Sequence, residues 1–384
     1  LQWIGDKARF DISYESFQYD IPYDRGTAFV NGKPVSIGYK TRLDDYTNHA
    51  WGRNQTFSSH WDYQFNDIWS TRISARMNQR HYSNNEVRVT AINTTTGAVT
   101  RRADANRGFN HKTKYLSWDM IGTPQLAGMT HNIVAGADYE MDQTYRAHAY
   151  TGKTNTIYNL NRPVYGMVPV TDSSTEKKST ANLLNRIHSR SVYVKDSIEL
   201  TGKWTGVLGG RYQHYEQRES SGFAPVSEKY NDIGNKFLPQ TGVIYKLTPD
   251  ISLYGSISKS FTPSTSIDDN GNVEQPEKGT TYETGTKWQI TPALFASLTL
   301  YNIEERDLSL SLNGSTYAVA KARSRGIEAE INGEIYSGWQ LSANYSYYQS
   351  IITSSEAPPS ELQSHSYNSY AVYCLTKKKH THAP

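Results

Sequence analysis

The stretch KFLPQTGVIYKLTPDISLYGSISKS, residues 236–260, decides the fold because apolar and polar side chains alternate along it. Phe237 and Val243 fall on one face of its first half, and Lys236 falls on the other. A period of two residues indicates β-strands with two unlike faces. A Thr-Pro-Asp turn joins the two halves, and TYETGTKWQITPALFASLTL, residues 281–300, repeats the arrangement. Each segment therefore predicts a hairpin with one apolar and one polar face.

Two features of these hairpins are typical of membrane barrels. Their strands span about 10 residues, which is the length that crosses a bilayer at a tilt. Aromatic side chains, among them Tyr245, Phe261, Tyr282 and Trp288, lie towards the ends of the apolar face, as in the aromatic girdles of outer-membrane barrels. A soluble β-sandwich also alternates, because it has one dry face and one wet face. The hairpins alone leave both folds open.

The composition narrows the class of protein. Only 36% of the 384 residues are hydrophobic and 29 are tyrosines, which suits a barrel with a wet interior better than a large dry core. No apolar run approaches the roughly 18 residues of a transmembrane helix. The 40 basic and 37 acidic residues are too balanced to indicate a nucleic-acid partner. The single Cys374 excludes an internal disulfide and a thiolate metal site.

The links between the predicted strands alternate in length. The periodicity predicts about 13 strands, and short turns, such as those near residues 201 and 248, alternate with long polar links. The long links are residues 21–50, 83–111, 146–188, 219–235, 262–279 and 305–315. Outer-membrane barrels have short periplasmic turns and long external loops, whereas soluble sheets have no reason for this alternation. The sequence therefore predicts an all-β, antiparallel transmembrane β-barrel.

The polar face of the predicted strands carries charges that we expect to pair inside the barrel. Three arginines lie on one face of a single predicted strand. Acidic residues of a later strand are their predicted partners, because a buried charge needs an opposite charge or water. These residues are Arg72, Arg76, Arg80, Asp138 and Glu140. Strict alternation would place Arg323 and Arg325 on the apolar face. We therefore predict a β-bulge at Gly326 that turns both side chains inward.

Several runs of this sequence resemble the barrel signatures of TonB-dependent ferric-siderophore receptors. The longest are YGSISKSFTP at 254–263, QPEKG at 275–279 with YETGTK at 282–287, and RSRGIEAE at 323–330. Shorter matches are PYDRG at 22–26, DSIEL at 196–200 and GGRY at 209–212. The matches follow the order of the family up to about Tyr348, so as a set they are specific.

The resemblance implies a bacterial outer-membrane barrel of about 22 strands around a plug, of which this chain holds an incomplete set. Such a receptor binds a ferric siderophore outside and releases it inward with energy from the TonB–ExbB–ExbD complex. Residues 1–350 would form the partial barrel, without a plug or a TonB-contacting segment, and residues 351–384 a loop and a divergent tail that reads as out of frame. Because lipid does not tolerate open sheet edges, we expect this part alone not to transport.

In receptors of this family, aromatic and basic side chains of the outer loops and upper lumen hold the siderophore. The candidate ligand residues are Tyr39, Trp51, Tyr82, Tyr145, Tyr150, Tyr158 and Tyr165, and packing in a girdle or a loop is the alternative role of each. The motif residues expected to form lumenal ion pairs are Glu283, Lys287, Glu328 and Glu330. We expect no cofactor, since the iron is part of the ligand, and no protein-bound metal, since His380 and His382 lie in a solvated tail.

No enzyme motif stands in the sequence. Gly-x-Ser-x-Gly, His-Glu-x-x-His and a phosphate-binding glycine loop are all missing, so we expect no enzymatic activity. Two alternatives remain beside the receptor. One is a soluble β-rich protein that binds or hydrolyses carbohydrate, and the other is a passive outer-membrane porin.

Overall fold

The computed structural model describes residues 1–24, 26, 28–30, 33–38, 40–160, 162–166, 182–221, 228–263, 276–312, 315–354 and 366–377. Within these residues sixteen strands form one antiparallel sheet, and two short strands form a separate small sheet. No helix in this part of the chain combines the length and the apolar character needed to cross a membrane.

The strands of the large sheet follow one another in chain order. The first half of the sheet consists of β1 (Gln2–Ile4), β2 (Ala8–Pro22), β5 (His49–Gln64), β6 (Trp69–Asn93), β7 (Ala98–Gly122), β9 (Met129–Asn159) and β10 (Leu183–Glu199). The second half consists of β11 (Trp204–Ser221), β12 (Glu228–Lys246), β13 (Ile251–Thr262), β14 (Glu277–Thr291), β15 (Leu294–Leu312), β16 (Ser315–Tyr336), β17 (Trp339–Ser354) and β18 (Ser366–Lys377). The short β8 (Gln125–Leu126) pairs with β9, and β3 (Phe29–Val30) pairs with β4 (Lys33–Pro34) in the small sheet.

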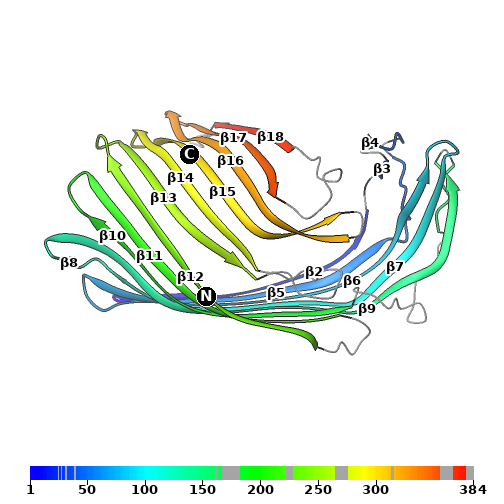
Figure 1. The fold of residues 1–384 in the computed structure, drawn as a ribbon, viewed down its shortest axis with the longest axis horizontal. Helices are drawn as coiled ribbons and strands as arrows, with labels where there is room; N and C mark the ends of the chain where they lie inside the picture. Colours follow the sequence, from blue (N-terminus) through cyan, green and yellow to red (C-terminus); the bar gives the residue numbers. More distant parts are fainter. Residues whose placement is uncertain are drawn as a thin grey trace, which may run out of the picture.

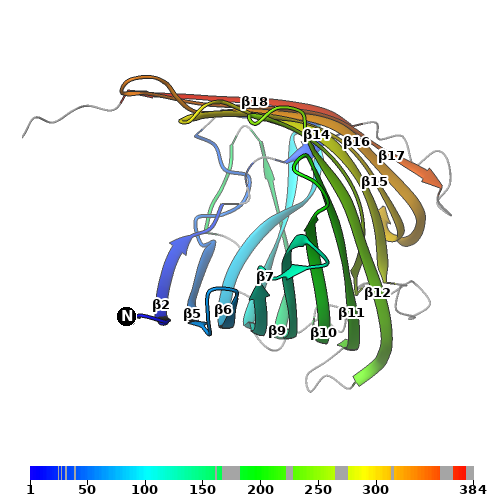
Figure 2. The ribbon, with the colours of Figure 1, turned by 90° about the vertical axis from the view of Figure 1, so that its left-hand side faces the viewer.

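The large sheet curls into an open trough. Figure 2 shows the strands from β2 to β18 following one arc, with a gap between β2 and β18. In the described part of the chain β1 and β18 each have one neighbour and do not pair with each other, so the sheet has two edges. The predicted antiparallel barrel sheet is therefore confirmed, and it is not closed.

The last strand lies inside the segment that the sequence separates as a divergent tail. β18 pairs with β17 in regular antiparallel register, from Ser366 opposite Ser350 to Lys377 opposite Trp339. The division of the chain at residue 350 stays a prediction.

The two faces of the sheet differ in the predicted way, and neighbouring residues show it. Val192 is 58% exposed and Leu208 is 58% exposed, whereas Ser191 is 5% exposed and Asp138 is 8% exposed. Side chains converge on the concave face of a curved sheet and spread apart on the convex face, so the polar face is the concave one. In the described part of the chain no helix or second large sheet covers the apolar convex face. The soluble sandwich is therefore wrong.

In four of the predicted long links most of the described residues are strand, and one of the four is 219–235, where β11 runs to Ser221 and β12 begins at Glu228. β6 and β7 continue through residues 83–111 and turn at residues 94–97, and β9 runs on to Asn159. β15 likewise runs through residues 305–312. Figure 1 shows β6, β7 and β9 reaching beyond their neighbours and bending away. The period of two residues did not reveal these extensions. A strand with water on both sides still forms its backbone hydrogen bonds, but its apolar and polar side chains have no reason to alternate.

The predicted bulge at Gly326 is wrong. Gly326 pairs regularly with Tyr301 of β15 and Tyr348 of β17, and the nearest register shift in β16 lies between Lys321 and Ala322. Arg325 therefore stays on the side of the apolar face, where its Nε donates to Asn302 Oδ1 at 2.8 Å. Because this arginine lies beyond the apolar part of the strands, its head group reaches water while its stem covers the sheet.

Tyrosines lie over glycines at five places on the polar face. Each tyrosine is directly opposite a glycine of the adjacent strand, and a Cβ on that glycine would lie within 3.0 Å of the phenol oxygen. The pairs are Tyr19 with Gly52, Tyr193 with Gly136, Tyr215 with Gly234, Tyr254 with Gly285 and Tyr301 with Gly326. Two of these phenols reach one strand further, since Tyr193 donates to Asp119 and Tyr254 bonds Thr299 Oγ1 at 2.9 Å. The glycines therefore let a ring tie three strands together.

We predict that Gly136→Ala lowers the free energy of unfolding by about 1–3 kcal/mol, the usual cost of overpacking. A Cβ at Gly136 would lie 2.5 Å from the carbonyl oxygen of Trp118 and 2.7 Å from Tyr193 Oη, so the ring must leave its position. Urea unfolding of the whole gene product in phospholipid vesicles measures the change. Gly202→Ala is the control, because a Cβ there meets nothing within 4 Å. Equal unfolding curves for the two variants would show that the tyrosine tie contributes nothing.

Candidate functional site

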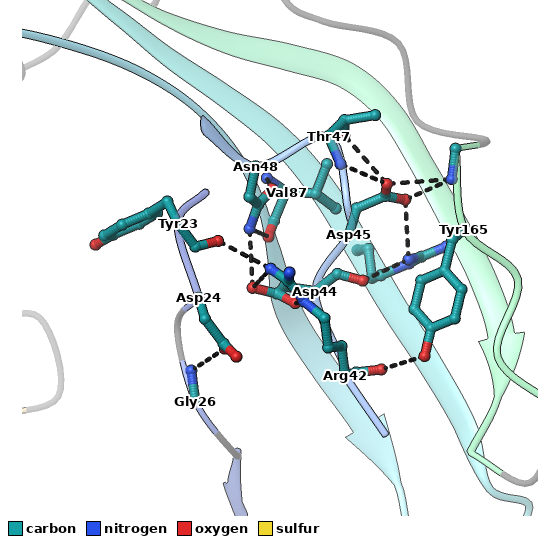
Figure 3. Close-up of polar contacts among 12 residues, drawn as sticks. Tyr23, Asp24, Gly26, Arg42, Asp44, Asp45, Thr47, Asn48, Val87 and Tyr165 are labelled. Carbon is teal, nitrogen blue, oxygen red and sulfur yellow. Dashed lines mark hydrogen bonds and ion pairs between the residues drawn. The ribbon is translucent and has the colours of Figure 1, made fainter. Parts of the chain in front are cut away.

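Long segments of the chain gather at the end of the sheet opposite the short turns, which we call the long-link end. Residues 42–48, the extended β6–β7 hairpin and residues 162–166 meet there (Figures 1 and 3). Polar side chains hold these segments to one another. We call this group the clasp; it consists of Arg42, Asp44, Asp45, Asn48, Arg101 and Tyr165.

Arg101 and Asp45 form the centre of the clasp, and both side chains are fully buried. Arg101 Nη1 donates to the carbonyl oxygen of Asp44 at 2.9 Å and lies 3.4 Å from Asp45 Oδ2, and Nη2 donates to the carbonyl oxygen of Val164. The Asp45 carboxylate also accepts from the backbone N–H of Gly166 at 2.9 Å and from that of Thr47 at 3.1 Å. One arginine of β7 thus joins the first and third long links.

Asp44 holds a second set of contacts beside this pair. Arg42 donates to both of its carboxylate oxygens, Nε at 2.7 Å and Nη2 at 3.0 Å, and Asn48 Nδ2 donates to Oδ2 at 2.9 Å. Asn48 in turn bonds both backbone groups of Val87 on β6. The hydrogen bond to Asp44 raises the pKa of the Arg42 guanidinium. These contacts fix residues 42–48 against the hairpin.

Aromatic and apolar packing completes the clasp. The Tyr165 phenol donates to the carbonyl oxygen of Arg42 at 3.0 Å, and its ring lies 4.5 Å from that of Tyr46. Burial raises the pKa of the Tyr165 phenol. Leu43 and Val99 are buried and form a small dry core. Ile37, Val89 and Leu160 are among the side chains that pack against it. The long links therefore pack on each other as a small folded unit at the end of the sheet.

A row of aromatic and basic side chains lies on the concave face near this end. Tyr82 of β6 is directly opposite Phe109 of β7, which is directly opposite Arg146 of β9. The rings of Tyr82 and Phe109 meet edge to face at 6.1 Å, and Arg80 lies 5.7 Å from the centre of the Tyr82 ring. We call these four residues the upper row. Two arginines beside two rings can receive an anionic ligand with a flat or apolar part.

Two of the candidate ligand residues lie on the outer face of the sheet, and a third is almost fully buried. Trp51 falls on the apolar face of β5, because it shares the parity of the exposed Trp61 and its pairing with β6 is regular. Tyr145 falls on the opposite face of β9 from Asp138 for the same reason. Tyr150 is only 9% exposed, so little of its surface can touch a ligand. Among the candidates whose side chains the structure describes, Tyr82 has the best position for a ligand on the concave face.

The remaining candidates divide between the clasp and residues outside the described part. Tyr165 is a member of the clasp, where its hydroxyl donates a hydrogen bond to the carbonyl oxygen of Arg42. Tyr39 lies outside the described residues, and so does the side chain of Tyr158.

The charges on the concave face form a cross-strand row with partners other than those expected. Arg72 Nε donates to Asp62 Oδ1 of β5 at 2.7 Å, and Asp138 accepts two hydrogen bonds from Arg211 of β11, one of them at 2.8 Å. The expected pairing of the Arg72 strand with the Asp138 strand is wrong for these residues, because Arg72 bonds Asp62 on the neighbouring strand β5 and Arg211 reaches across β10 to occupy Asp138.

The other predicted lumenal charges also lie on the polar face by register. Arg76, Arg80, Glu140, Glu283, Lys287, Glu328 and Glu330 share this face with Arg72 and Asp138. Lys287 Nζ lies 5.7 Å from the centre of the Tyr254 ring. The described residues hold no group of three or more His, Cys, Asp or Glu side chains placed to bind a metal.

Sequence reasoning missed the contacts of the clasp and two of the four residues of the upper row, Phe109 and Arg146. Asp44, Asp45, Arg101 and Phe109 all lie in segments that had been set aside as polar links. The one available signal was the density of charge in Arg-Leu-Asp-Asp at 42–45 and Arg-Arg at 101–102, which is unusual for a link that only needs to be soluble.

Comparisons with known proteins agree with this geometry. A family model described as TonB dependent receptor-like, beta-barrel matches residues 1–376. The metal-pseudopaline receptor CntO of Pseudomonas aeruginosa is 24% identical over 318 residues, covering 79% of this chain and 43% of the relative. The ferrichrome outer membrane transporter/phage receptor of Escherichia coli K12 is 26% identical over 377 residues, covering 89% of this chain and 49% of the relative.

A solved structure shows the same fold. The siderophore receptor PiuA from Acinetobacter baumannii superposes with a TM-score of 0.79 at 20% identity, covering 94% of this chain and 56% of that chain. At this identity the likeness speaks for the fold alone. The chain spans about half the length of the curated relatives that it matches.

Proposed function

This chain belongs to the family of TonB-dependent receptor-like β-barrels, which lie in the bacterial outer membrane, and on that premise we propose that it forms part of a receptor for ferric siderophores. Relatives of the chain are named as receptors for ferric-pyoverdine, ferrichrome and ferrioxamine B. The proposal extends their kind of ligand to this protein. It includes uptake driven by the TonB–ExbB–ExbD complex, as the family name suggests, and assigns no enzymatic reaction.

The upper row supports the proposal that the ligand binds at the long-link end. Tyr82, Phe109, Arg80 and Arg146 combine two rings with two cations on the concave face, just below the clasp. A ferric siderophore has a compact chelate that rings can pack against, and its metal-binding oxygens are anionic. Because the clasp fixes the long links beside this row, the ligand would meet a surface that is already ordered.

Growth under iron starvation tests the proposal. The full-length gene is deleted and restored, and cells are supplied with single siderophores as the only iron source. We expect the deletion strain to lose growth on at least one siderophore and the restored strain to regain it. Unchanged growth of the deletion strain on every siderophore in a panel of hydroxamates, catecholates and mixed-ligand types would overturn the proposed function.

Paired aromatic variants then test the position of the ligand. We expect Tyr82→Ala to weaken binding of that siderophore by about tenfold. The loss of one aromatic contact costs about 1.4 kcal/mol, which corresponds to a tenfold change in the dissociation constant. Trp51→Ala is the matched control, because Trp51 lies on the adjacent strand but on the opposite face. Binding of the radiolabelled ferric siderophore to whole cells gives both dissociation constants. If Trp51→Ala weakens binding as much as Tyr82→Ala, the ligand does not use the upper row.

A further inference from the structure

A buried carboxylate without a partner lies on the concave face at the long-link end. Glu219 begins the fourth predicted long link. Its side chain lies on the concave face because β11 pairs regularly with β10 up to this residue and Glu219 shares the parity of Arg211, which bonds Asp138 there. Glu219 is only 6% exposed, and within the described residues its Oε2 accepts no hydrogen bond. Because a buried carboxylate is costly unless it is paired, this position favours a partner with hydrogen-bond donors.

A second acceptor lies beside this carboxylate. Asn185 of β10 is directly opposite Glu219, and its Oδ1 is likewise buried and accepts no hydrogen bond in the described part of the chain. Residues that are directly opposite in antiparallel strands have their Cβ atoms about 5 Å apart, so one small group can contact both oxygens. An ionised carboxylate and an amide oxygen accept hydrogen bonds and donate none. We call Glu219 and Asn185 the acceptor pair.

The described part of the protein supplies no cation to the acceptor pair. Burial raises the pKa of the Glu219 carboxyl to about 7, and no neighbouring charge contributes to that shift. The nearest carboxylates on this face have partners of their own, since Asp142 of β9 bonds His111 at 2.8 Å and Asp232 of β12 accepts from Tyr215 at 3.0 Å. On β10 the concave residues from 183 to 191 include no ionisable side chain. The remaining ionisable residues in these rows are Arg146 of β9 and Tyr230 of β12.

The acceptor pair lies in the row of residues next to the upper row. Arg80, which is a member of the upper row, is directly opposite His111 of β7, and His111 is directly opposite Thr144 of β9. Thr144 is in turn directly opposite Asn185, and Asn185 is directly opposite Glu219. All these residues lie on the concave face. A ligand that packs on the upper row therefore lies on the same surface as the acceptor pair.

We propose that the acceptor pair binds a primary ammonium group of the ligand, and that the receptor therefore selects ferric siderophores that carry a free amine. The inference rests on the proposed function, because it adds a contact to a ligand that packs on the upper row. An ammonium donates three hydrogen bonds, which can reach Glu219 and Asn185 together, and its charge strengthens the bond to the carboxylate. Because Glu219 is almost fully covered, a compact ammonium on a narrow chain fits this site better than a planar guanidinium.

Two forms of one siderophore test this inference on the purified full-length protein in detergent. The first is a linear ferric tris-hydroxamate that ends in a primary amine, and the second is the same complex with the amine acetylated. Isothermal titration calorimetry at pH 8 gives both dissociation constants. We expect the free-amine form to bind about 10- to 100-fold more tightly, which is the value of a hydrogen bond to a charged group. Acetylation leaves the chelate and its contacts with the upper row unchanged.

Glu219→Gln should remove this difference between the two forms. The free-amine form should then bind as weakly as the acetylated form, and the acetylated form should bind as it does to the unchanged protein. Glu216→Gln is the matched control, because Glu216 lies on the same strand but on the opposite face, where Arg218 Nε donates to it at 2.7 Å. This control should leave both dissociation constants unchanged.

The pH of the solution gives an independent readout. With a pKa of about 7, about one tenth of the Glu219 carboxyls are ionised at pH 6, whereas an alkyl amine keeps its charge. The free-amine form should therefore bind about tenfold more weakly at pH 6 than at pH 8. Any other group that titrates in this range acts on both forms alike, so the acetylated form isolates the effect of Glu219.

Four results would contradict the inference and leave the proposed function standing. They are equal affinities for the two forms, an equal loss of both forms in Glu219→Gln, which marks a structural role, an equal effect of Glu216→Gln on the free-amine form, and the same pH dependence for both forms. Binding of another siderophore of the panel but of neither hydroxamate form would also refute the inference alone. If the protein binds no siderophore of the panel, the proposed function itself fails.

Discussion

Arg101→Ala should open the clasp at a cost of about 3–5 kcal/mol, because it leaves the carboxylate of Asp45 buried without its counter-ion. The guanidinium lies within 3.4 Å of Asp45 and also holds the backbone of residues 44 and 164, and neither charged side chain touches water. Hydrogen exchange of the whole gene product in detergent measures the local opening. The amide protons of Gly166 and Thr47, which donate to Asp45, should exchange on the order of 100-fold or more faster.

The neighbouring arginine provides the control for this prediction. Arg102 bonds Asp104 at 3.0 Å, but its side chain is 21% exposed, so Arg102→Ala should cost about 1 kcal/mol or less. Adding Asp45→Asn to Arg101→Ala should recover part of the loss, because the uncompensated charge is removed. If Arg101→Ala and Arg102→Ala change the exchange of Gly166 equally, the buried pair does not hold the long links.

Leu208→Arg should destabilise the barrel in a membrane by about 2–4 kcal/mol, the cost of a guanidinium near the middle of the lipid-facing belt. Leu208 lies on β11 four residues from Trp204 and four from Tyr212, the two aromatic side chains that mark the ends of the belt. All three are exposed on the convex face, at 58%, 44% and 50%. Guanidinium unfolding in phospholipid vesicles measures the loss, and a lower yield of assembled protein in the outer membrane accompanies it.

Val207→Arg is the matched control, since it adds the same charge at the same depth but on the polar face. Val207 pairs with Gly242, whose missing side chain leaves room for a longer one. We expect this variant to unfold within about 1 kcal/mol of the unchanged protein. A larger loss for Val207→Arg than for Leu208→Arg would reverse the assignment of the two faces.

Most of the fold could be predicted because it depends on local periodicity. The alternation placed β13 and β14 within a few residues of their observed bounds, whereas β12 begins at Glu228, eight residues before the stretch that predicted it. The extensions of β6, β7 and β9 could not be predicted in this way. Beyond the membrane both faces of a strand meet water or a folded link, so no solvent difference forces alternation.

The sequence by itself determined which residues face lipid and which face the enclosed side, because a period of two along each strand assigns the faces wherever one solvent is apolar. Only the tertiary structure decided the partners. Arg72 bonds Asp62 and not the acidic row of β9, and Trp51 points away from Tyr82, because strand order and register set these distances. The same holds for Asp45 and Arg101, which are 56 residues apart in the chain. No local pattern encodes a contact between residues that meet only after the sheet has curled and the long links have packed upon it.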